Sequence, residues 1–218
     1  NAVLLRPLPY PDADRLVDWA FQNNLQVIGG PLLDFSGRDL PDWLWEKERD
    51  LLSMANYLTD HAGTVVRRYH DRIRTWQVSA ASNWAGVLAM GDDELLWLTV
   101  RVIDAVKKID PTLDIIVGVA QPWGDYLAQQ ERNQSPFVFA DTLLRTGVKL
   151  AGLELEFLHG VAPRGSYCRD TLDASRILDL YALLGVPLHV LLGYPSSAAA
   201  DPQADPDQRL QNGHWRSG

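Results

Sequence analysis

The feature that most constrains the fold of this chain is a regular alternation between short apolar runs and longer amphipathic segments. The runs are rich in Val, Ile and Leu, and their length is typical of strands that are covered on both faces. They recur roughly every 35 to 50 residues, which predicts repeated βα units around a parallel sheet. The runs lie at residues 25–29, 75–80, 113–120, 152–157 and 187–193.

The segments between the runs have the spacing of helices. Residues 92–108 begin with acidic side chains, which favour a helix N-terminus, and repeat their apolar side chains along one face. Residues 169–185 show the same spacing and end on Gly185, a typical C-terminal cap. Residues 42–70 are also predicted to be helical, in two pieces around Gly63.

Both doubly wound sheets and barrels fit this alternation. The sequence IGGPL at the end of the first run is not the glycine-rich fingerprint of a nucleotide-binding fold, so a barrel is favoured. The chain has 218 residues, does not begin with Met, and falls short of the ~250 residues of a complete barrel. We therefore predict an α/β fold: an incomplete (β/α)8 TIM barrel over residues 1–197, truncated at both ends, with about five parallel strands and intervening helices. Residues 198–218 are expected to form a polar loop or tail.

Charge and composition narrow the range of partners. The chain has 20 basic and 28 acidic residues, a net charge of -8, and its basic residues form no stripe. This argues against nucleic acid or an anionic membrane as a partner. No stretch approaches the ~20 apolar residues of a membrane helix. A single cysteine, Cys168, allows neither an internal disulfide nor a thiolate zinc site, and no other metal motif is present, so we expect no metal and no cofactor.

In parallel βα folds the functional side chains cluster at the carboxyl ends of the strands and in the loops that follow. Here these positions are rich in aromatic and amide groups. Aromatic rings pack on sugar faces, and amides pair with sugar hydroxyls, so the pattern is typical of a carbohydrate site. The alternative for each Trp is that it closes the end of the barrel without touching a ligand. The predicted substrate-binding residues are Asp34, Gln77, Asn83, Trp84, Gln121, Trp123, Tyr126, His159, Arg164 and Tyr194.

Two glutamates stand out within one apolar run. Glu154 and Glu156 lie two residues apart, so a strand would point both to one face. Buried carboxylates need partners, and Arg164 or Arg169 in the following loop are candidates for a structural ion network. The other interpretation is a catalytic site, with Glu156 favoured because it lies nearer the strand end. His189, inside another apolar run, is more typical of a hydrogen-bonded core histidine than of a ligand.

Two stretches carry a resemblance to a known family. They are DADRLVDWAFQNNLQVIGGPLLDFSGRDLPDWL and VVRRYHDRIRTWQV. Together they resemble the middle of the family 10 glycoside hydrolases, the xylanase-type (β/α)8 barrels, whose pattern runs aD.iv.wA..n.l.v.GH.LvWH, then lP.Wl, then ry.g.i..WdVvNE. The likeness extends from about residue 12 to 197, with PLHVLLGYPSS similar to the seventh-strand segment. Matching positions are Asp14, Ala20, Gly29, Leu32, Pro41, Trp43, Arg68, Tyr69, Trp76 and Val78.

The departures from this pattern fall where the family's chemistry lies. The resemblance places the family's acid/base glutamate at Ala80–Ala81 and its nucleophile at or near Leu192. The family's WH pair falls on Asp34 and Phe35. A retaining glycosidase needs two carboxyl groups ~5 Å apart around the glycosidic bond, and alkyl side chains supply neither.

Three hypotheses for the function stay open at this point. The first is a family 10-like barrel that binds β-linked oligo- or polysaccharide without the retaining two-glutamate mechanism. The second is an active O-glycosyl hydrolase whose carboxylates have moved to Asp34, Glu154 or Glu156. The third is a non-catalytic scaffold domain of a larger protein. The resemblance also implies an extracellular or cell-envelope location, although the residues themselves leave the compartment open.

Overall fold

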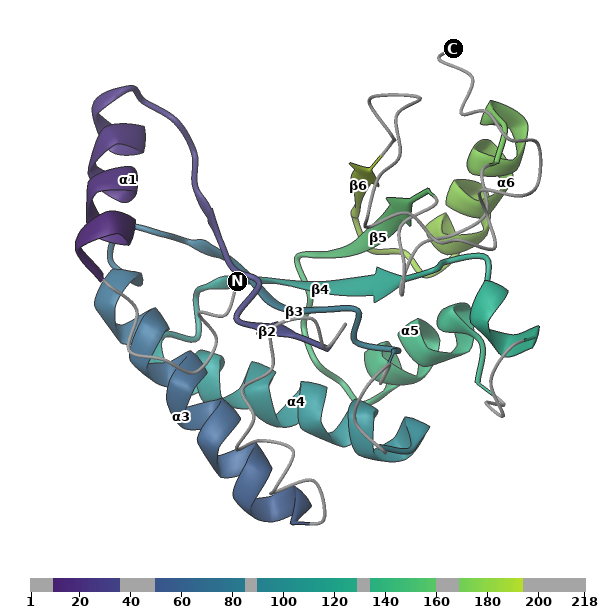
Figure 1. Ribbon diagram of the computed structural model, residues 1–218, viewed down its shortest axis with the longest axis horizontal. Helices are drawn as coiled ribbons and strands as arrows, with labels where there is room; N and C mark the ends of the chain where they lie inside the picture. The colour runs from purple at the N-terminus through teal and green to yellow at the C-terminus, as the bar shows by residue number, and fades with distance from the viewer. Residues whose placement is uncertain (1–9, 36–49, 85–89, 129–133, 160–168, 194–218) are drawn as a thin grey trace, which may run out of the picture.

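A computed structural model of the chain describes residues 10–35, 50–84, 90–128, 134–159 and 169–193. These residues form one sheet with helices between successive strands (Figure 1). The elements are α1 (Tyr10–Gln22), β1 (Ile28–Gly29), β2 (Leu33–Asp34), α3 (Leu51–Tyr69), β3 (Thr75–Ala80), α4 (Asp92–Ile109), β4 (Asp114–Ala120), the 3-10 helix η1 (Asp125–Ala128), α5 (Pro136–Arg145), β5 (Gly152–Leu158), α6 (Thr171–Ala182) and β6 (Leu188–Gly193).

All strand pairs are parallel, and the strand order is β1-β3-β4-β5-β6, with β2 also pairing with β3. Figure 1 shows α3, α4 and α5 along one side of the sheet. Neighbours in the chain are therefore neighbours in the sheet, joined by helical crossovers, as in a (β/α)8 barrel. The predicted incomplete barrel with parallel strands and intervening helices is confirmed.

Helix α3 corrects one prediction. Its buried stripe, which includes Met54, Leu58, Ala62 and Val66, continues without a break past Gly63. A glycine inside a helix costs only about 1 kcal/mol relative to alanine, and burial of this stripe outweighs that cost. The expected break at Gly63 is therefore wrong, and residues 42–49 of that prediction lie outside the described residues.

The first predicted strand is also different in the structure. Residues 25–29 yield only the two-residue strand β1, and pairing resumes in β2 after Gly30. Gly30 has φ 121°, and a Cβ there would lie 2.2 Å from the carbonyl oxygen of Gln77. The close approach of these two backbones requires glycine and interrupts the strand.

Helix α5 is absent from the predicted elements. It is short, ten residues, and its start is defined by Ser135, whose side chain accepts a hydrogen bond from the backbone N–H of Val138, and by Pro136 in the first turn. Both are standard N-terminal signals. A helix of this length gives too little periodicity to be separated from the loop before it.

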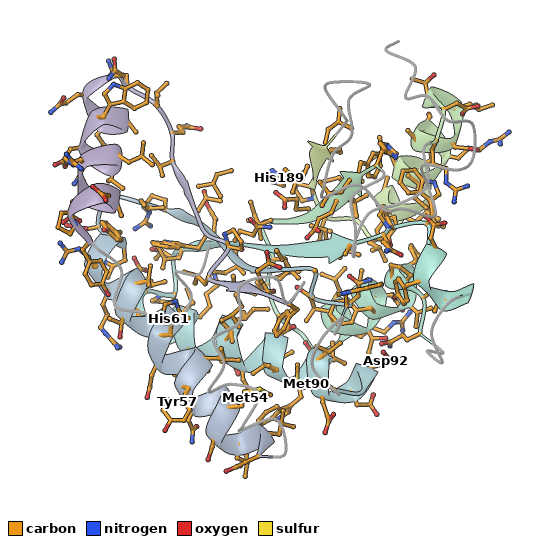
Figure 2. All side chains as sticks on the ribbon, in the orientation of Figure 1. Met54, Tyr57, His61, Met90, Asp92 and His189 are labelled. Atoms are coloured by element: carbon orange, nitrogen blue, oxygen red, sulfur yellow. The ribbon has the colours of Figure 1, made fainter. Side chains whose placement is uncertain are left out.

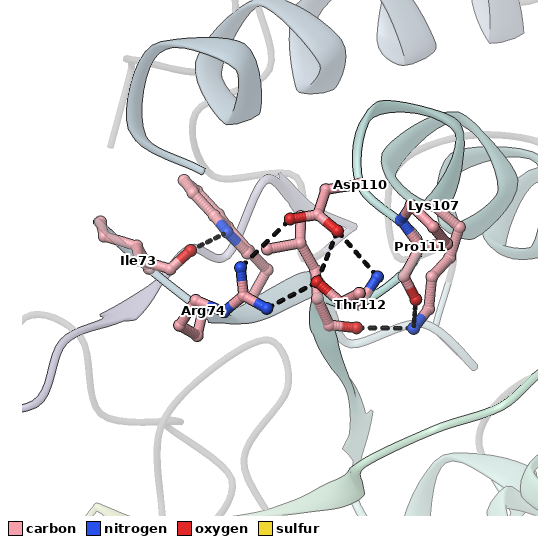
Figure 3. Close-up of polar contacts among 8 residues, drawn as sticks. Ile73, Arg74, Lys107, Asp110, Pro111 and Thr112 are labelled. Carbon is pink, nitrogen blue, oxygen red and sulfur yellow. Dashed lines mark hydrogen bonds and ion pairs between the residues drawn. The ribbon is translucent and has the colours of Figure 1, made fainter. Parts of the chain in front are cut away.

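Polar contacts fix the amino-terminal edge of the sheet, between β3 and β4 (Figure 3). The Arg74 guanidinium donates to Asp110 at 3.1 Å and also to Thr112, and Lys107 donates to the carbonyl oxygens of Pro111 and Leu113. Hydrogen bonds from Thr112, followed by the charge of Arg74, hold the pKa of Asp110 below its usual value. This edge is opposite the carboxyl ends of the strands, where barrel enzymes have their sites, so we assign its contacts to stability.

The two outer strands of the sheet lack an outer neighbour among the described elements. On β6, Val190 is 45% exposed and Leu192 is 63% exposed, and Ile28 on β1 is 54% exposed. Apolar side chains on open parallel strands are the expected consequence of a sheet that does not close on itself. None of the described helices has the length and apolar character to cross a membrane.

Candidate active site

Strand β5 presents its two glutamates to the side of the sheet away from the apolar core. Leu153, Leu155 and Phe157 alternate with them and belong to the core. Glu154 is in register with His189 of β6. Because registered residues of parallel strands point to the same face, His189 marks the face on which the glutamates lie. Figure 2 shows His189 on the opposite side of the sheet from α3 and α4.

Glu154 is half-buried and lies one step nearer the amino-terminal end of β5 than Glu156. Its Oε1 accepts a hydrogen bond of 2.6 Å from the side-chain amide of Gln77 on β3. The contact spans β4, so the two side chains meet across the inner face of the sheet. Both residues were predicted to belong to the site, and the structure brings them together.

Glu156 lies one step nearer the carboxyl end of β5, and its side chain is fully buried. Its Oε1 accepts a hydrogen bond of 2.7 Å from the backbone N–H of Ala81, which follows β3. Gly118 of β4 lies beneath this contact, and a Cβ at that position would lie 3.0 Å from Glu156 Oε1. The carboxylate of β5 thus reaches the end of β3 because β4 has no side chain at Gly118.

A tight turn, residues 81–84, follows β3 and is buried throughout. Ala81 has φ 50°, in the left-handed region, and the N–H of Ser82 donates to the carbonyl oxygen of Gly118 at 2.9 Å. The Asn83 side chain binds both backbone groups of Ala120. Its Oδ1 accepts from the Ala120 N–H at 2.8 Å, and its Nδ2 donates to the Ala120 carbonyl at 2.9 Å. The Asn83 side chain therefore pairs with the edge of β4 as the backbone of a neighbouring strand would.

Two of the predicted aromatic binding residues are interior residues. Trp84 is 3% exposed and Tyr126 is 1% exposed, and their rings pack edge to face with centroids 5.3 Å apart. The Tyr126 hydroxyl accepts a hydrogen bond from Asn83 Nδ2 and donates one to the carbonyl of Gln134. In this structure both rings pack on protein, which is the alternative considered for each Trp in the sequence.

Trp123 is half-buried at the carboxyl end of β4. Its ring packs against Phe157, with centroids 4.7 Å apart, and the guanidinium carbon of Arg169 lies 5.6 Å from the ring centroid. Arg169 also forms an ion pair of 2.5 Å with Asp125. Arg169, predicted as a partner for the glutamates, is therefore engaged with the β4 loop.

Three further predicted site residues lie along the same carboxyl edge. Asp34 is half-buried and in register with Ala80, and Gln121 has φ 45° just after β4. His159 follows β5, is 4% exposed and contacts Trp123. The other two, Arg164 and Tyr194, lie outside the described residues.

Gly118 contributes to this arrangement and was not predicted. A signal for Gly118 was present, because an isolated glycine inside an apolar strand indicates close approach of another group. Within the turn, the hydroxyl oxygens of Ser79 and Ser82 are hydrogen-bonded at 2.6 Å. Over the described ranges, no group of three or more His, Cys, Asp or Glu side chains is placed to hold a metal ion.

Comparison with known proteins links the amino-terminal part of the sequence to a family. The sequence model of glycosyl hydrolase family 10 matches residues 7–82, which run from before α1 through β3 into the turn that holds Ala81. Endo-1,4-beta-xylanase C of Paenibacillus barcinonensis is 35% identical over 75 residues, covering 32% of this chain and 7% of the xylanase. Endo-1,4-beta-xylanase B of Thermotoga neapolitana is 25% identical over 154 residues, covering 66% of this chain and 41% of the xylanase.

Residues 7–82 of this chain are similar to glycosyl hydrolase family 10. The fold agrees: a family 10 structure from Paenibacillus barcinonensis superposes with a TM-score of 0.64 at 18% identity, over 90% of this chain and 62% of that one. A family 10 xylanase from Thermobacillus composti gives a TM-score of 0.62 at 18% identity, over 89% and 57% of the two chains. The chain therefore spans less than two thirds of the length of these relatives and corresponds to part of their fold.

Proposed function

We propose that the protein containing this chain binds β-linked polysaccharide and does not cleave it by the retaining two-glutamate mechanism of family 10. The observation that carries the proposal is Ala81 at the carboxyl end of β3. The family resemblance aligns the acid/base glutamate with Ala80–Ala81, and in the structure the Ala81 side chain is a fully buried methyl group. A methyl group cannot protonate a leaving oxygen.

The position aligned with the nucleophile supports the same proposal. It falls at or near Leu192 on β6, and the neighbouring position on the face of the glutamates, in register with Glu156, is also a leucine, Leu191. An isobutyl group cannot attack an anomeric carbon, so the covalent step of the retaining mechanism has no nucleophile at this position.

The carbohydrate part of the proposal rests on the relatives and on the polar groups of the inner face. The matched relatives are named as endo-1,4-beta-xylanases, enzymes for a β-linked polysaccharide. Asp34 and Glu154 are half-buried, and Gln77 donates a hydrogen bond to Glu154. Amide and carboxylate groups of this kind pair with sugar hydroxyls. We therefore propose a β-linked polysaccharide as the ligand of this protein.

One observation favours a second candidate, a glycosidase with relocated carboxylates. Glu156 Oε1 lies 2.7 Å from the Ala81 nitrogen, beside the place where the family's acid/base side chain would begin. Glu154, two residues away on the same face, lies about 6.6 Å along the strand from Glu156 by the usual rise per residue.

One assay distinguishes the two candidate functions, polysaccharide binding without cleavage and glycoside hydrolysis. The full-length protein is incubated with insoluble β-1,4-xylan, and bound protein and released reducing sugar are measured on the same sample. We expect binding with no release above the level of a heat-denatured sample. Release that disappears in Glu156→Gln would favour the glycosidase, and absence of binding to xylan and to other β-linked glycans would contradict the carbohydrate proposal.

A further inference from the structure

The hydrogen bond from Ala81 to Glu156 joins two strands that are not neighbours. We propose that Glu156 is a positioning residue. Its carboxylate fills, from β5, the place at the end of β3 that has no acidic side chain of its own, and it holds the Ala81 backbone at the start of the 81–84 turn in its left-handed conformation. The effect on ligand binding rests on the proposed function, whereas the effect on the turn does not.

The path of the Glu156 side chain shows how specific this contact is. In the sheet Glu156 is in register with Ala120 of β4, so its side chain must cross β4 to reach β3. Gly118 provides the crossing: a Cβ there would come within 3.0 Å of Glu156 Oε1, of Ala80 Cα and of the Ser79 carbonyl oxygen. A side chain at position 118 would therefore compete with the carboxylate for the same space.

The left-handed backbone conformation of Ala81, the first residue of the turn, needs contacts that stabilise it. Ala81 has φ 50°, a value that residues other than glycine rarely adopt unless contacts hold the backbone there. The Ala81 N–H is also buried, and a buried N–H must be paired. Glu156 meets this need, and the Ser82–Gly118 and Asn83–Ala120 hydrogen bonds fix the rest of the turn to β4.

A positioning role and a catalytic role predict opposite results for one substitution. Accepting the Ala81 hydrogen bond requires an oxygen atom and no charge, and the amide oxygen of glutamine provides one. Acting as an acid or a base requires a carboxyl group. Glu156→Gln should therefore restore what Glu156→Ala loses if the residue positions the turn, and should abolish turnover if the residue is catalytic.

The proposal also predicts a conflict at position 81. A glutamate introduced there would bring a second carboxylate next to Glu156 in a buried place, and like charges in contact cannot both stay ionised at low cost. The folded-state pKa of one of the pair would rise above its unfolded value. The penalty of Ala81→Glu is then largest at neutral pH and falls as the pH is lowered through that raised pKa.

The test measures hydrogen exchange of the Ala81 amide and xylan binding in the full-length protein. We expect exchange at Ala81 to be at least about tenfold faster in Glu156→Ala than in the unaltered protein and to return close to normal in Glu156→Gln. Unchanged exchange in Glu156→Ala would overturn the proposal. If the unaltered protein does not bind xylan, the proposed function fails while the exchange result still decides the role of Glu156.

A second pair of variants covers the case in which Glu156→Ala does not fold. Ala81→Glu and Ala81→Gln add side chains of equal size and differ in charge. We expect the midpoint of thermal unfolding of Ala81→Glu to lie below that of Ala81→Gln at pH 7 and to approach it in acid, and Glu156→Gln in the Ala81→Glu background to remove the difference. Equal midpoints at every pH would show that no carboxylate lies beside position 81.

Discussion

At the scale of single residues, the turn after β3 is held by side chains that hydrogen-bond to backbone groups, as a neighbouring strand would. Asn83 is the clearest example, because its amide pairs with both the N–H and the carbonyl oxygen of Ala120. Its role could not be read from the sequence, because its partner is 37 residues away. The same is true of the glutamates: their shared face follows from their spacing, but Gln77 and Ala81 lie 77 and 75 residues from the glutamates they contact.

Substitution Asn83→Asp should make the stability of the protein depend on pH in a new way. A protonated aspartic acid can reproduce both hydrogen bonds, whereas the ionised form places a negative oxygen against the Ala120 carbonyl. The pKa of the introduced carboxyl in the folded state therefore lies above its unfolded value of about 3.9, and stability is lost as the pH rises. We expect a loss of about 1–3 kcal/mol at pH 7 that shrinks towards pH 4, measured by urea unfolding. Asn83→Leu serves as the control, and a loss that is equally pH-independent in both variants would contradict the role of the amide.

Gly118→Ala should destabilise the protein by about 1–3 kcal/mol. The added methyl group would meet two backbone atoms as well as Glu156 Oε1 at 3.0 Å, and backbone cannot move away as the end of a side chain can. Gly91→Ala is the matched control, because its methyl group would meet only the end of Glu94 at 3.8 Å. Equal midpoints of thermal unfolding for the two variants would show that the crossing at Gly118 is not tight.

At the scale of elements, polar contacts join helices α1 and α3. Asp14 accepts hydrogen bonds from Arg68 and from the Tyr69 hydroxyl, and Asp18 accepts one from Arg72 at 2.7 Å. The hydrogen bond from Arg68, followed by that from Tyr69, holds the pKa of Asp14 below its usual value. A carboxyl with a depressed pKa contributes stability above its unfolded pKa, and that contribution is lost as the pH falls through the folded pKa.

Asp14→Asn should therefore lower the midpoint of thermal unfolding at pH 7, and the decrease should be smaller near pH 3, which lies below the unfolded pKa of about 3.9 and closer to the lowered folded pKa. The comparison is with Asp12→Asn, which removes a pair with Arg15 that is largely exposed within α1 and should matter little at either pH. A decrease of the same size at both pH values would show that Asp14 acts through packing and not through its charge.

The elements differ in how well their sequence defines them. Helix α4 was predicted at 92–108 and spans Asp92–Ile109, because its acidic start and buried stripe are both local signals. The first strand was predicted at residues 25–29, whereas β1 covers only Ile28–Gly29 and pairing resumes in β2. The interruption at Gly30 could not be predicted, because it depends on a contact with Gln77 far along the chain. Local periodicity defines long helices and buried strands, whereas contacts between distant residues define where they are interrupted.

At the scale of the whole molecule, the described sheet has two open edges. We expect the outer edges of β1 and β6 to be covered by further strands in the complete protein, in keeping with the predicted truncated barrel. Isolated residues 1–218 should then self-associate, because open parallel edges with exposed apolar side chains favour pairing between molecules. Val190→Lys on β6 should reduce the association seen by sedimentation velocity, and Leu172→Lys on α6, also at an exposed position, should not. A monomer at every concentration would contradict this view of the edges.

We propose that the protein containing this barrel binds a β-linked polysaccharide without the two-glutamate chemistry that the family resemblance aligns with the ends of β3 and β6. Proton NMR of a β-1,4-xylo-oligosaccharide mixed with the full-length protein tests both halves in one time course. We predict broadening of the oligosaccharide signals, which reports binding, with the internal anomeric signals unchanged over time. Growth of new reducing-end signals would contradict the account, and so would spectra identical to those of the oligosaccharide alone.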